Sequence, residues 1–452
     1  MKQTLKVLIS LLLTFVLVFS LTACASSAEE AQPSSNAAEE PSESGEETKD
    51  PVELYLWDMT WGTADNMKLA MDNITQRYME ENPNVTITYE IKAWDSFMET
   101  YSTAIASGTT PDMTCGGCCQ VGLYHAQGEL LDLTPVVDAW KAESNPILGD
   151  FTEQTTTLFQ YDDMLAAFCF GVDAKVIMYR KDFLEQSGYT GDLSTIEEFR
   201  KALEMCKEAF PDKTPFIAPG NGTIANHNMS VMLGLFGMGY TDEDIVPCLS
   251  SEKGLEVCQF IQDLWKDGLI GEADAGYQEA DGQKVFANGG GVFILGMNTA
   301  SFRDNDFFDQ MEIMAIPEGG VAVNCPNPVF CFANSEHNKV DPQPTYDYLK
   351  WWMENNKEFF IDSGHSCFPT RASYYEDEYY ASEPLRGQCF ERNIAVGYPE
   401  TYPAPIVYPA YLMVDGEKLL AGGFQRLIMG DDVAEVAADT DAIIQEAIDT
   451  YN

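Results

Sequence analysis

The sequence predicts a protein of the α/β class with two lobes. Strand-like and helix-like segments alternate from residue 54 onward, an order that is typical of α/β folds. The chain after residue 50 has about 400 residues of ordinary apolar content, which is more than one hydrophobic core accommodates. A short apolar run at the start of the chain is typical of an export signal, so both lobes are expected outside the cytoplasmic membrane.

The first 24 residues have the pattern of a secretory signal. Lys2 and Lys6 precede the apolar run 7–21, and its length of about 15 residues is short of the ~20 that a spanning helix needs. The run ends in Leu21-Thr22-Ala23-Cys24, which resembles the lipobox of bacterial lipoproteins. That resemblance implies removal of residues 1–23 and acylation of Cys24. The protein would then be held at the extracellular face of the cytoplasmic membrane by lipid alone. An ordinary signal peptide with an incidental cysteine and an uncleaved anchor are the alternatives.

Residues 24–50 are predicted to form an acidic, disordered linker. After Cys24 the segment contains neither aromatic nor large aliphatic residues, and its acidic residues far outnumber its one lysine, Lys49. Such a composition buries too little apolar surface to offset the entropy lost on ordering. The folded part is therefore expected to begin near Pro51.

The first elements after the linker alternate between strand and helix. Strands are predicted at 54–57 and 85–91, and helices at 65–82 and 97–107, the second of which is closed by Gly108. The apolar face of the first helix would consist of Met67, Met71, Ile74 and Tyr78.

Three further helices are indicated later in the chain. Ser194-Thr195-Ile196-Glu197 has the pattern of a capping box, in which the serine oxygen caps a helix that continues beyond Ile196. Residues 346–360 are helical in pattern and rich in aromatic residues, which are expected in the core. The chain ends in an Ala- and Asp-rich helix at 433–451.

The formal charge of −46 narrows the possible partners. Nucleic acid is excluded as a partner because its phosphates require a basic surface. A broad contact with an anionic membrane is disfavoured for the same reason. The acidity favours solubility, and we expect a monomer.

Twelve cysteines are unusual in an exported chain. Apart from Cys24, several lie among apolar residues, as small buried side chains do. Cys115-Gly116-Gly117-Cys118-Cys119 contains a CxxC pattern, which is compatible with a structural role, a disulfide or a metal site. A zinc site needs four ligands, and the sequence has no second CxxC beside scattered histidines. We therefore expect neither a metal nor another cofactor.

Several motifs resemble the sugar-binding group of extracellular solute-binding proteins of ABC importers. Their order and spacing agree along nearly all of residues 51–452, although Arg180, Ile196 and the segment 286–293 depart from the usual residues of the group. The matching segments are Glu81-Asn82-Pro83, 106–112 (ASGTTPD), 127–133 (QGELLDL), 179–183 (YRKDF) with Gly188, 195–199 (TIEEF), 286–293 (FANGGGVF) and 368–371 (FPTR).

The resemblance implies a type II periplasmic-binding-protein-like fold with three crossover segments between its lobes. By position, lobe 1 would comprise 51–171 plus 322–363, and lobe 2 would comprise 172–321 plus 364–452. A mono- or oligosaccharide would bind in the cleft between the lobes and be delivered to the permease subunits of an ABC importer.

Candidate ligand-binding residues follow the predicted strands. Asp58 and Trp61 come after the first strand, and Trp94 and Asp95 come after the second. Sugars present apolar C–H faces and hydroxyl groups, which aromatic rings and carboxylates recognise. Gly117 would let the backbone approach the ligand.

Further candidates are implied by position in the resembling family. Asp173 falls where relatives have a ligand-binding glutamate, and Asn298 falls where they often have a stacking tryptophan. His227 follows a glycine-rich stretch, and Tyr402 and Tyr408 lie where relatives place an aromatic platform. Asp112, in the 106–112 turn, is expected to be structural.

Two other functions remain open. A polyamine or another cation is an alternative solute, which clustered carboxylates in the cleft without an aromatic platform would favour. A glycoside hydrolase is the remote alternative, since two carboxylates suffice for that reaction. The HExxH, GxSxG and P-loop motifs are missing from the sequence, so we expect a protein that is not an enzyme.

Overall fold

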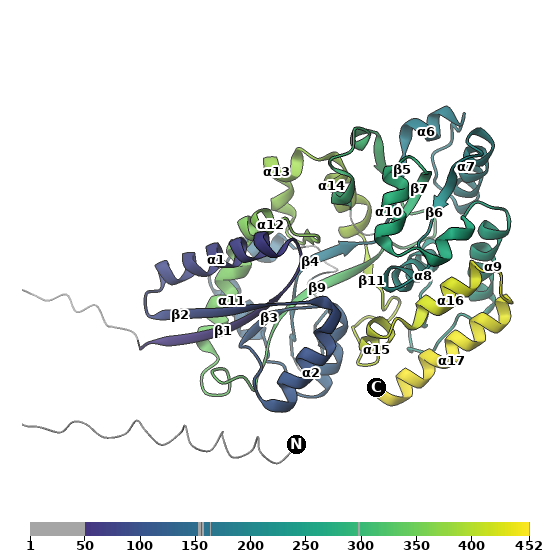
Figure 1. Cartoon of the computed structure of the whole chain (residues 1–452). Coiled ribbons are helices and arrows are strands. Elements are labelled where there is room, and N and C mark those ends of the chain that lie inside the picture. The colour runs from purple at the N-terminus through teal and green to yellow at the C-terminus, as the bar shows by residue number, and fades with distance from the viewer. Residues whose placement is uncertain (1–49, 152–154, 156–157, 163, 297–298, 452) are drawn as a thin grey trace, which may run out of the picture. The chain divides into compact units, whose positions relative to one another are not determined.

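The computed structural model describes residues 50–151, 155, 158–162, 164–296 and 299–451. The predicted signal at 1–23, the predicted lipidation site Cys24 and the predicted linker up to residue 49 lie outside the described residues. Within them, strands and helices alternate, which confirms the predicted α/β class (Figure 1). No helix of this part combines the length and apolar character needed to cross a membrane.

The larger of two sheets is built mainly from the first strands of the chain. Its order is β10-β4-β9-β3-β1-β2, and β11 pairs with β9 from outside this path. β1 is parallel to β2 and to β3, whereas β9 is antiparallel to β3 and β4. Its strands are β1 (Val52–Met59), β2 (Val85–Lys92), β3 (Met113–Cys115), β4 (Phe168–Ala174), β9 (Val323–Cys331), β10 (Phe368–Pro369) and β11 (Tyr398–Pro399).

The smaller sheet has the order β6-β7-β5-β8. β6 is parallel to β7, and β5 is antiparallel to β7 and β8. Its strands are β5 (Val176–Arg180), β6 (Thr214–Ile217), β7 (Gly291–Gly296) and β8 (Met311–Ile313).

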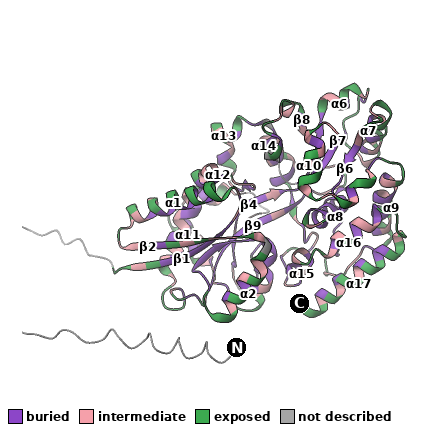
Figure 2. Ribbon diagram, in the orientation of Figure 1, coloured by how far each residue is buried: buried purple, intermediate pink, exposed green. Residues whose placement is uncertain are grey.

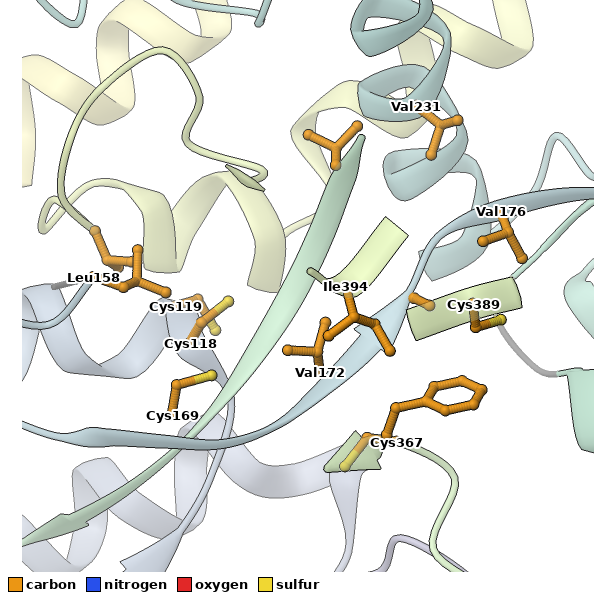
Figure 3. Packing of buried hydrophobic residues seen from close by; sticks show 14 of the residues in the cluster. Cys118, Cys119, Leu158, Cys169, Val172, Val176, Val231, Cys367, Cys389 and Ile394 are labelled. Atoms are coloured by element: carbon orange, nitrogen blue, oxygen red, sulfur yellow. The ribbon is translucent and has the colours of Figure 1, made fainter. Parts of the chain in front are cut away.

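One residue, Lys175, separates the two sheets where the chain first passes from one to the other. β4 of the larger sheet ends at Ala174, and β5 of the smaller sheet begins at Val176. The chain returns between β8 and β9. Figure 3 shows Val172 and Val176 on the two sides of this junction, with Ile394 beside Val172. Any side chain close to Lys175 is therefore next to both sheets.

Helices cover both sheets, and their buried faces close the core (Figure 2). Helix α1 buries the predicted stripe of Met67, Met71, Ile74 and Tyr78. The α-helices are α1 (Ala64–Glu81), α2 (Phe97–Ser107), α3 (Cys118–Ala126), α4 (Thr134–Ala142), α6 (Lys181–Gln186), α7 (Ile196–Ala209), α8 (Thr223–Leu235), α9 (Glu252–Lys266), α10 (Glu279–Ala287), α11 (Gln343–Asn355), α12 (Lys357–Ser363), α13 (Glu378–Ala381), α14 (Pro384–Cys389), α15 (Tyr411–Gly416), α16 (Leu419–Leu427) and α17 (Val433–Tyr451).

Most predicted helices are confirmed, with two corrections. Helix α2 ends at Gly108, which has the left-handed conformation (φ 66°) that glycine adopts without steric cost. The capping prediction was wrong by one residue, because the Thr195 oxygen accepts the hydrogen bond from the Glu198 amide. The predicted helix 346–360 is two helices, α11 and α12, that meet at Asn356.

The structural role expected of Asp112 is confirmed. Asp112 is buried and holds its turn, because its carboxylate accepts hydrogen bonds from the Tyr55 amide and the Ser335 hydroxyl. The eleven described cysteines are free thiols, and all are buried except Cys248 and Cys325, which are half-buried.

Candidate functional site

A cavity of about 680 Å³ is lined by the larger sheet with its loops and by the helices α8, α10 and α15. This volume is within the ~300–1,000 Å³ typical of small-molecule sites. Because β1, β2 and β3 are parallel, their carboxyl ends lie at one edge of the larger sheet, and residues just after them line the cavity. The lining residues are Thr60, Trp61, Trp94, Ser96, Phe97, Met98, Glu99, Gly117, Cys119, Asp173, Lys175, Thr223, His227, Glu279, Cys325, Asn327, Ser366, Asp415, Gly416, Glu417 and Lys418.

Trp61 is held in a fixed orientation at the cavity wall. Its indole Nε1 donates a hydrogen bond of 2.9 Å to Asp58 Oδ1. The His365 ring stacks on it at 5.0 Å, and Trp94 meets it edge-on at 4.7 Å. The ring is 4% exposed, so it offers only an edge to the cavity and loses little entropy when a ligand binds.

Asp58 lies behind Trp61 and is not among the lining residues. It was predicted as a ligand contact, but its Oδ1 also accepts the Met59 amide at 2.7 Å. Burial raises the pKa of the Asp58 carboxyl to about 7, although the hydrogen bonds from Trp61 and Met59 oppose the rise. The geometry therefore makes Asp58 the residue that orients Trp61.

Trp94 gives the cavity its second aromatic wall. It begins the short 3₁₀ turn Trp94–Ser96 after β2, and its Nε1 donates to the Thr60 carbonyl at 3.0 Å. Phe97 packs against it at 5.7 Å. Asp95 lies in the same turn, and its side chain is outside the described part of the structure.

The start of α3 presents backbone to the cavity. Gly117 is the N-cap residue, and its amide donates to Gln120 Oε1 at 2.9 Å. A Cβ at this position would lie 3.6 Å from the Trp94 ring. Glycine therefore leaves open the space beside the indole.

The cavity also contains the junction between the sheets. Asp173 lines it and accepts a hydrogen bond of 3.2 Å from the Asn327 amide on β9. Lys175 lines it too, although its side chain is almost fully buried. Burial alone would lower the pKa of Lys175, but the nearby Cys325, Glu400 and other acidic groups raise it above its ordinary value. Lys175 is therefore a buried cation compensated by carboxylates.

His227, Glu400 and Asp415 form a charged cluster, which we call the acidic floor. His227 Nδ1 lies 2.8 Å from Glu400 Oε1 and 4.0 Å from Asp415 Oδ1. The Tyr411 hydroxyl donates to Glu400 Oε2 at 2.9 Å. Burial opposes ionisation of Glu400, yet His227 and Lys175 hold its pKa below the ordinary value. Burial and the adjacent Glu400 raise the pKa of Asp415.

The acidic floor has the ligand types of a metal site, since its three donor atoms lie within 4.8 Å of one another. Lys175 faces the same carboxylates and already supplies a cation. A divalent ion would be repelled by this ammonium group, so the arrangement fits a hydrogen-bonded ion network better than a metal centre.

The two predicted tyrosines lie away from the cavity lining. Tyr408 is 1% exposed, and its hydroxyl is 2.7 Å from that of Tyr240. Tyr402 is half-buried and packs against Tyr398 at 5.0 Å. Asn298 lies outside the described residues. Of the predicted residues, the cavity brings together Trp61, Trp94, Gly117, Asp173 and His227.

Several lining residues were missed by sequence reasoning. Lys175 interrupts an apolar strand pattern, and a buried charge in such a run needs a partner. This interruption is the one local signal that could have pointed to Lys175 as a site residue. Glu279 begins α10, Asp415 lies in the last turn of α15, and Lys418 is the N-cap residue of α16, so none of them has an unusual local sequence context. Only the packing of α10, α15 and the start of α16 brings these three residues to the cavity.

Comparison with known proteins decides the family. A family model described as bacterial extracellular solute-binding protein matches residues 73–388. The chain belongs to this family. Among curated proteins, a binding protein of Brucella abortus (strain 2308) is 21% identical to this solute-binding protein over 287 residues, covering 62% of the chain and 67% of the relative.

Solved structures share the fold of this solute-binding protein. A sugar transporter from Arthrobacter chlorophenolicus A6, with bound laminaribiose, has a TM-score of 0.73 and 19% identity, covering 87% of this chain and 99% of that one. The sugar-binding protein MalE of Xanthomonas citri has a TM-score of 0.71 and 15% identity, covering 88% and 98%. These likenesses confirm the predicted two-lobed, type II fold.

Proposed function

We propose that this protein captures a mono- or oligosaccharide in the described cavity and delivers it to the permease of an ABC importer. The observation that carries the proposal is the pairing of aromatic rings with hydrogen-bonding groups in one cavity. Trp94 and Phe97 provide apolar surface for the C–H faces of a sugar, and Trp61 adds the edge of its ring. Asp173 and Asn327 provide polar atoms for its hydroxyl groups. The sugars named for the similar structures support the same substrate class.

The proposed mechanism is a hinge closure of two lobes around the ligand. We place lobe 1 at 51–171 plus 322–363 and lobe 2 at 172–321 plus 364–452. The strands of the smaller sheet fall wholly within the second set. β10 and β11 pair with the larger sheet but come from the lobe 2 segment, which suits connecting strands. A ligand that contacts both lobes favours the closed form because it gains contacts there.

The cellular setting of the proposal is the outer face of the cytoplasmic membrane. The family is extracellular. The apolar run before Cys24 supports export, and the lipobox-like residues support a lipid anchor. We propose that the protein acts by binding alone, as a monomer without catalytic turnover.

A cationic solute is the second candidate, because the cavity lining is rich in carboxylates. Glu99, Asp173, Glu279, Asp415 and Glu417 line it, against Lys175 and Lys418. A polyamine or an amino-substituted sugar would gain from this imbalance, whereas the aromatic wall favours a sugar ring.

A thermal-shift and calorimetric panel tests these proposals. The purified protein is titrated with maltose, laminaribiose, longer glucans and the polyamine putrescine. A ligand present at 100 times its Kd stabilises the folded state by about 2.7 kcal/mol, which raises Tm. A response to glycans supports the sugar proposal, and a response confined to putrescine supports the second candidate. Release of cleaved sugar during incubation would contradict a purely binding role.

A further inference from the structure

Two cysteines that are far apart in the sequence meet at the cavity wall. Cys118 is the first residue of α3, and Cys325 lies in β9. Their sulfur atoms are 3.5 Å apart, although 207 positions separate them in the chain. Among the described residues, this is the one contact in which a thiol hydrogen-bonds another thiol.

The two thiols differ in their exposure. Cys118 is fully buried, and its sulfur also contacts the Tyr411 hydroxyl at 3.8 Å. Cys325 is half-buried and lines the cavity, so a small reagent that enters the cavity can reach it. Figure 3 shows Cys118 next to Cys119 at the start of their helix.

We propose that Cys118 and Cys325 are a reversible disulfide site in the wall of the cavity. Disulfide sulfurs are about 2.05 Å apart, so the two atoms must approach by roughly 1.5 Å. Rotation about the two Cα–Cβ bonds and a small shift of the α3 N-terminus can supply this approach. The neighbouring CxxC cysteine, Cys115, forms no such contact in the described structure.

The oxidant that suits this site is a small-molecule disulfide, R–S–S–R. The Cys325 thiolate attacks one sulfur of the reagent, which forms the mixed disulfide Cys325–S–S–R and releases RS⁻. The Cys118 thiolate then attacks the Cys325 sulfur, which closes the protein disulfide and releases the second RS⁻. The two protons lost by the cysteines are taken up by the two released thiolates, so the net products are one protein disulfide and two RSH.

The surroundings make this reaction slow at neutral pH. The hydrogen bond with Cys118 and burial raise the pKa of Cys325 well above its ordinary range, although Lys175 lowers it in part. Only a small fraction of the thiol is therefore ionised, and the rate should rise with pH. Such a site responds to sustained oxidation and is unsuited to rapid catalysis.

A metal site explains the contact between Cys118 and Cys325 less well than a disulfide does. Zinc needs four ligands, and two thiolates alone leave its shell incomplete. Among the described residues, the one group of three metal-ligating side chains is the acidic floor, which contains neither sulfur. A disulfide needs no third partner.

Closing the disulfide would alter the site where ligand is proposed to bind. Cys325 is the strand partner of Asp173 and faces Lys175, and Cys118 follows Gly117 beside Trp94. The cross-link would tie the α3 N-terminus to β9, next to the junction of the sheets. This consequence rests on the proposed function, because a ligand in the cavity would also cover Cys325.

Peptide mapping after oxidation tests the site directly. The purified protein is incubated with oxidised glutathione at pH 8.5, acid-quenched, alkylated under denaturing conditions and digested with trypsin. Cys115, Cys118 and Cys119 share the tryptic peptide 93–141, and Cys325 shares 304–339 with Cys331. Fragment ions are therefore needed to assign the bond. We expect a Cys118–Cys325 link and two fewer alkylated thiols per chain.

Matched variants keep the result interpretable. Cys119→Ser, next to Cys118 on the same helix, should retain the link, whereas Cys118→Ser and Cys325→Ser should abolish it. The map of the unmodified protein needs no variant, so a variant that fails to fold leaves the test intact. Persistence of both thiols, a stable glutathione adduct on Cys325, or a bond to Cys119 would overturn the proposal.

A ligand identified by the binding panel supplies a second measurement. At saturation it should slow formation of the link more than tenfold because it covers Cys325. If none of the tested sugars binds while the link still forms, the proposed sugar function fails and the disulfide site stands. An unchanged rate with a bound ligand would contradict the coupling of the two.

Discussion

The two walls of the cavity are built on different physical principles. The wall after β1 and β2 is aromatic, and its rings are oriented by single hydrogen bonds from Trp61 to Asp58 and from Trp94 to a backbone carbonyl. The acidic floor holds charged groups that compensate one another around Lys175. The aromatic wall can therefore lose one ring and remain folded, whereas the acidic floor depends on every charge for its stability.

The largest effect should come from removing one charge of the acidic floor. Glu400→Ala leaves the buried His227 without its nearest carboxylate and removes one of the carboxylates that compensate Lys175. Breaking such a buried pair costs about 3–5 kcal/mol. Urea unfolding should show this loss of free energy. Glu417→Ala, a cavity-lining residue with no ion pair among the described residues, is the matched control and should change stability by less than about 0.5 kcal/mol. Equal effects of the two substitutions would show that the stability of the acidic floor does not depend on the charge of Glu400.

Asp58, which orients Trp61 in the aromatic wall, should make the stability of the protein depend on pH. Folding raises the pKa of Asp58 from 3.8 to about 7, so the folded protein keeps a proton that the unfolded chain releases in this window. Wild-type stability therefore contains a contribution that falls as pH rises through the window. Asp58→Asn keeps the acceptor for Trp61 and removes the titration.

The measurement is urea unfolding of both proteins at pH 5 and pH 7. Because other titrating groups are common to both, the difference between the proteins isolates Asp58. Relative to wild type, the variant should gain about 2 kcal/mol between these two pH values. Parallel pH profiles of the two proteins would mean that Asp58 is ionised at both pH values and that burial does not raise its pKa.

A smaller effect is expected when one aromatic surface is removed. Trp94→Ala should weaken binding of the identified sugar by about 1.5 kcal/mol, roughly tenfold in Kd, with little loss of Tm because the ring is half-buried. Trp351→Ala, which removes a half-buried indole on α11 outside the cavity lining, is the control for calorimetry. An unchanged Kd for Trp94→Ala would remove the aromatic wall from the binding site.

The smallest effect is expected from removing the charge of Glu417, which lines the cavity next to the acidic floor. Glu417→Gln should change the affinity for a neutral sugar by less than about 0.5 kcal/mol, because Glu417 is exposed and solvent screens its carboxylate. A cationic ligand should instead bind more weakly to the variant, and its affinity should fall with added salt. Calorimetry at two salt concentrations separates these cases.

Local patterns predicted the helices more successfully than the site. The boundaries of α2 and α17 followed from Gly108 and from a continuous helical pattern, because such signals act within one turn of chain. The break at Asn356 was missed, since the aromatic residues on both sides belong to one buried cluster and carry a continuous apolar pattern. The shift of the cap from Ser194 to Thr195 reflects two adjacent residues that are equally able to cap.

The site predictions divided according to how far their partners lie along the chain. Trp61 and Trp94 follow parallel strands, so their place at one sheet edge was predictable from the strand order. Asp58 was assigned to the ligand because its sequence position cannot show that Trp61 turns back over it. Tyr408 was assigned likewise, but its hydroxyl pairs with Tyr240, 168 positions away.

The sequence alone determined the acidic composition of the chain, the α/β order of its elements and the spaced motifs between 81 and 371 that carry the family resemblance, and it predicted an export signal. These properties depend on residues close together in the sequence, so they can be predicted without knowing how the chain packs. Only the tertiary structure decided that Lys175 is a buried cation, that His227, Glu400 and Asp415 share one floor, and that Cys118 meets Cys325. Each depends on contacts between distant segments, and burial sets the energies of such contacts only once the chain has folded.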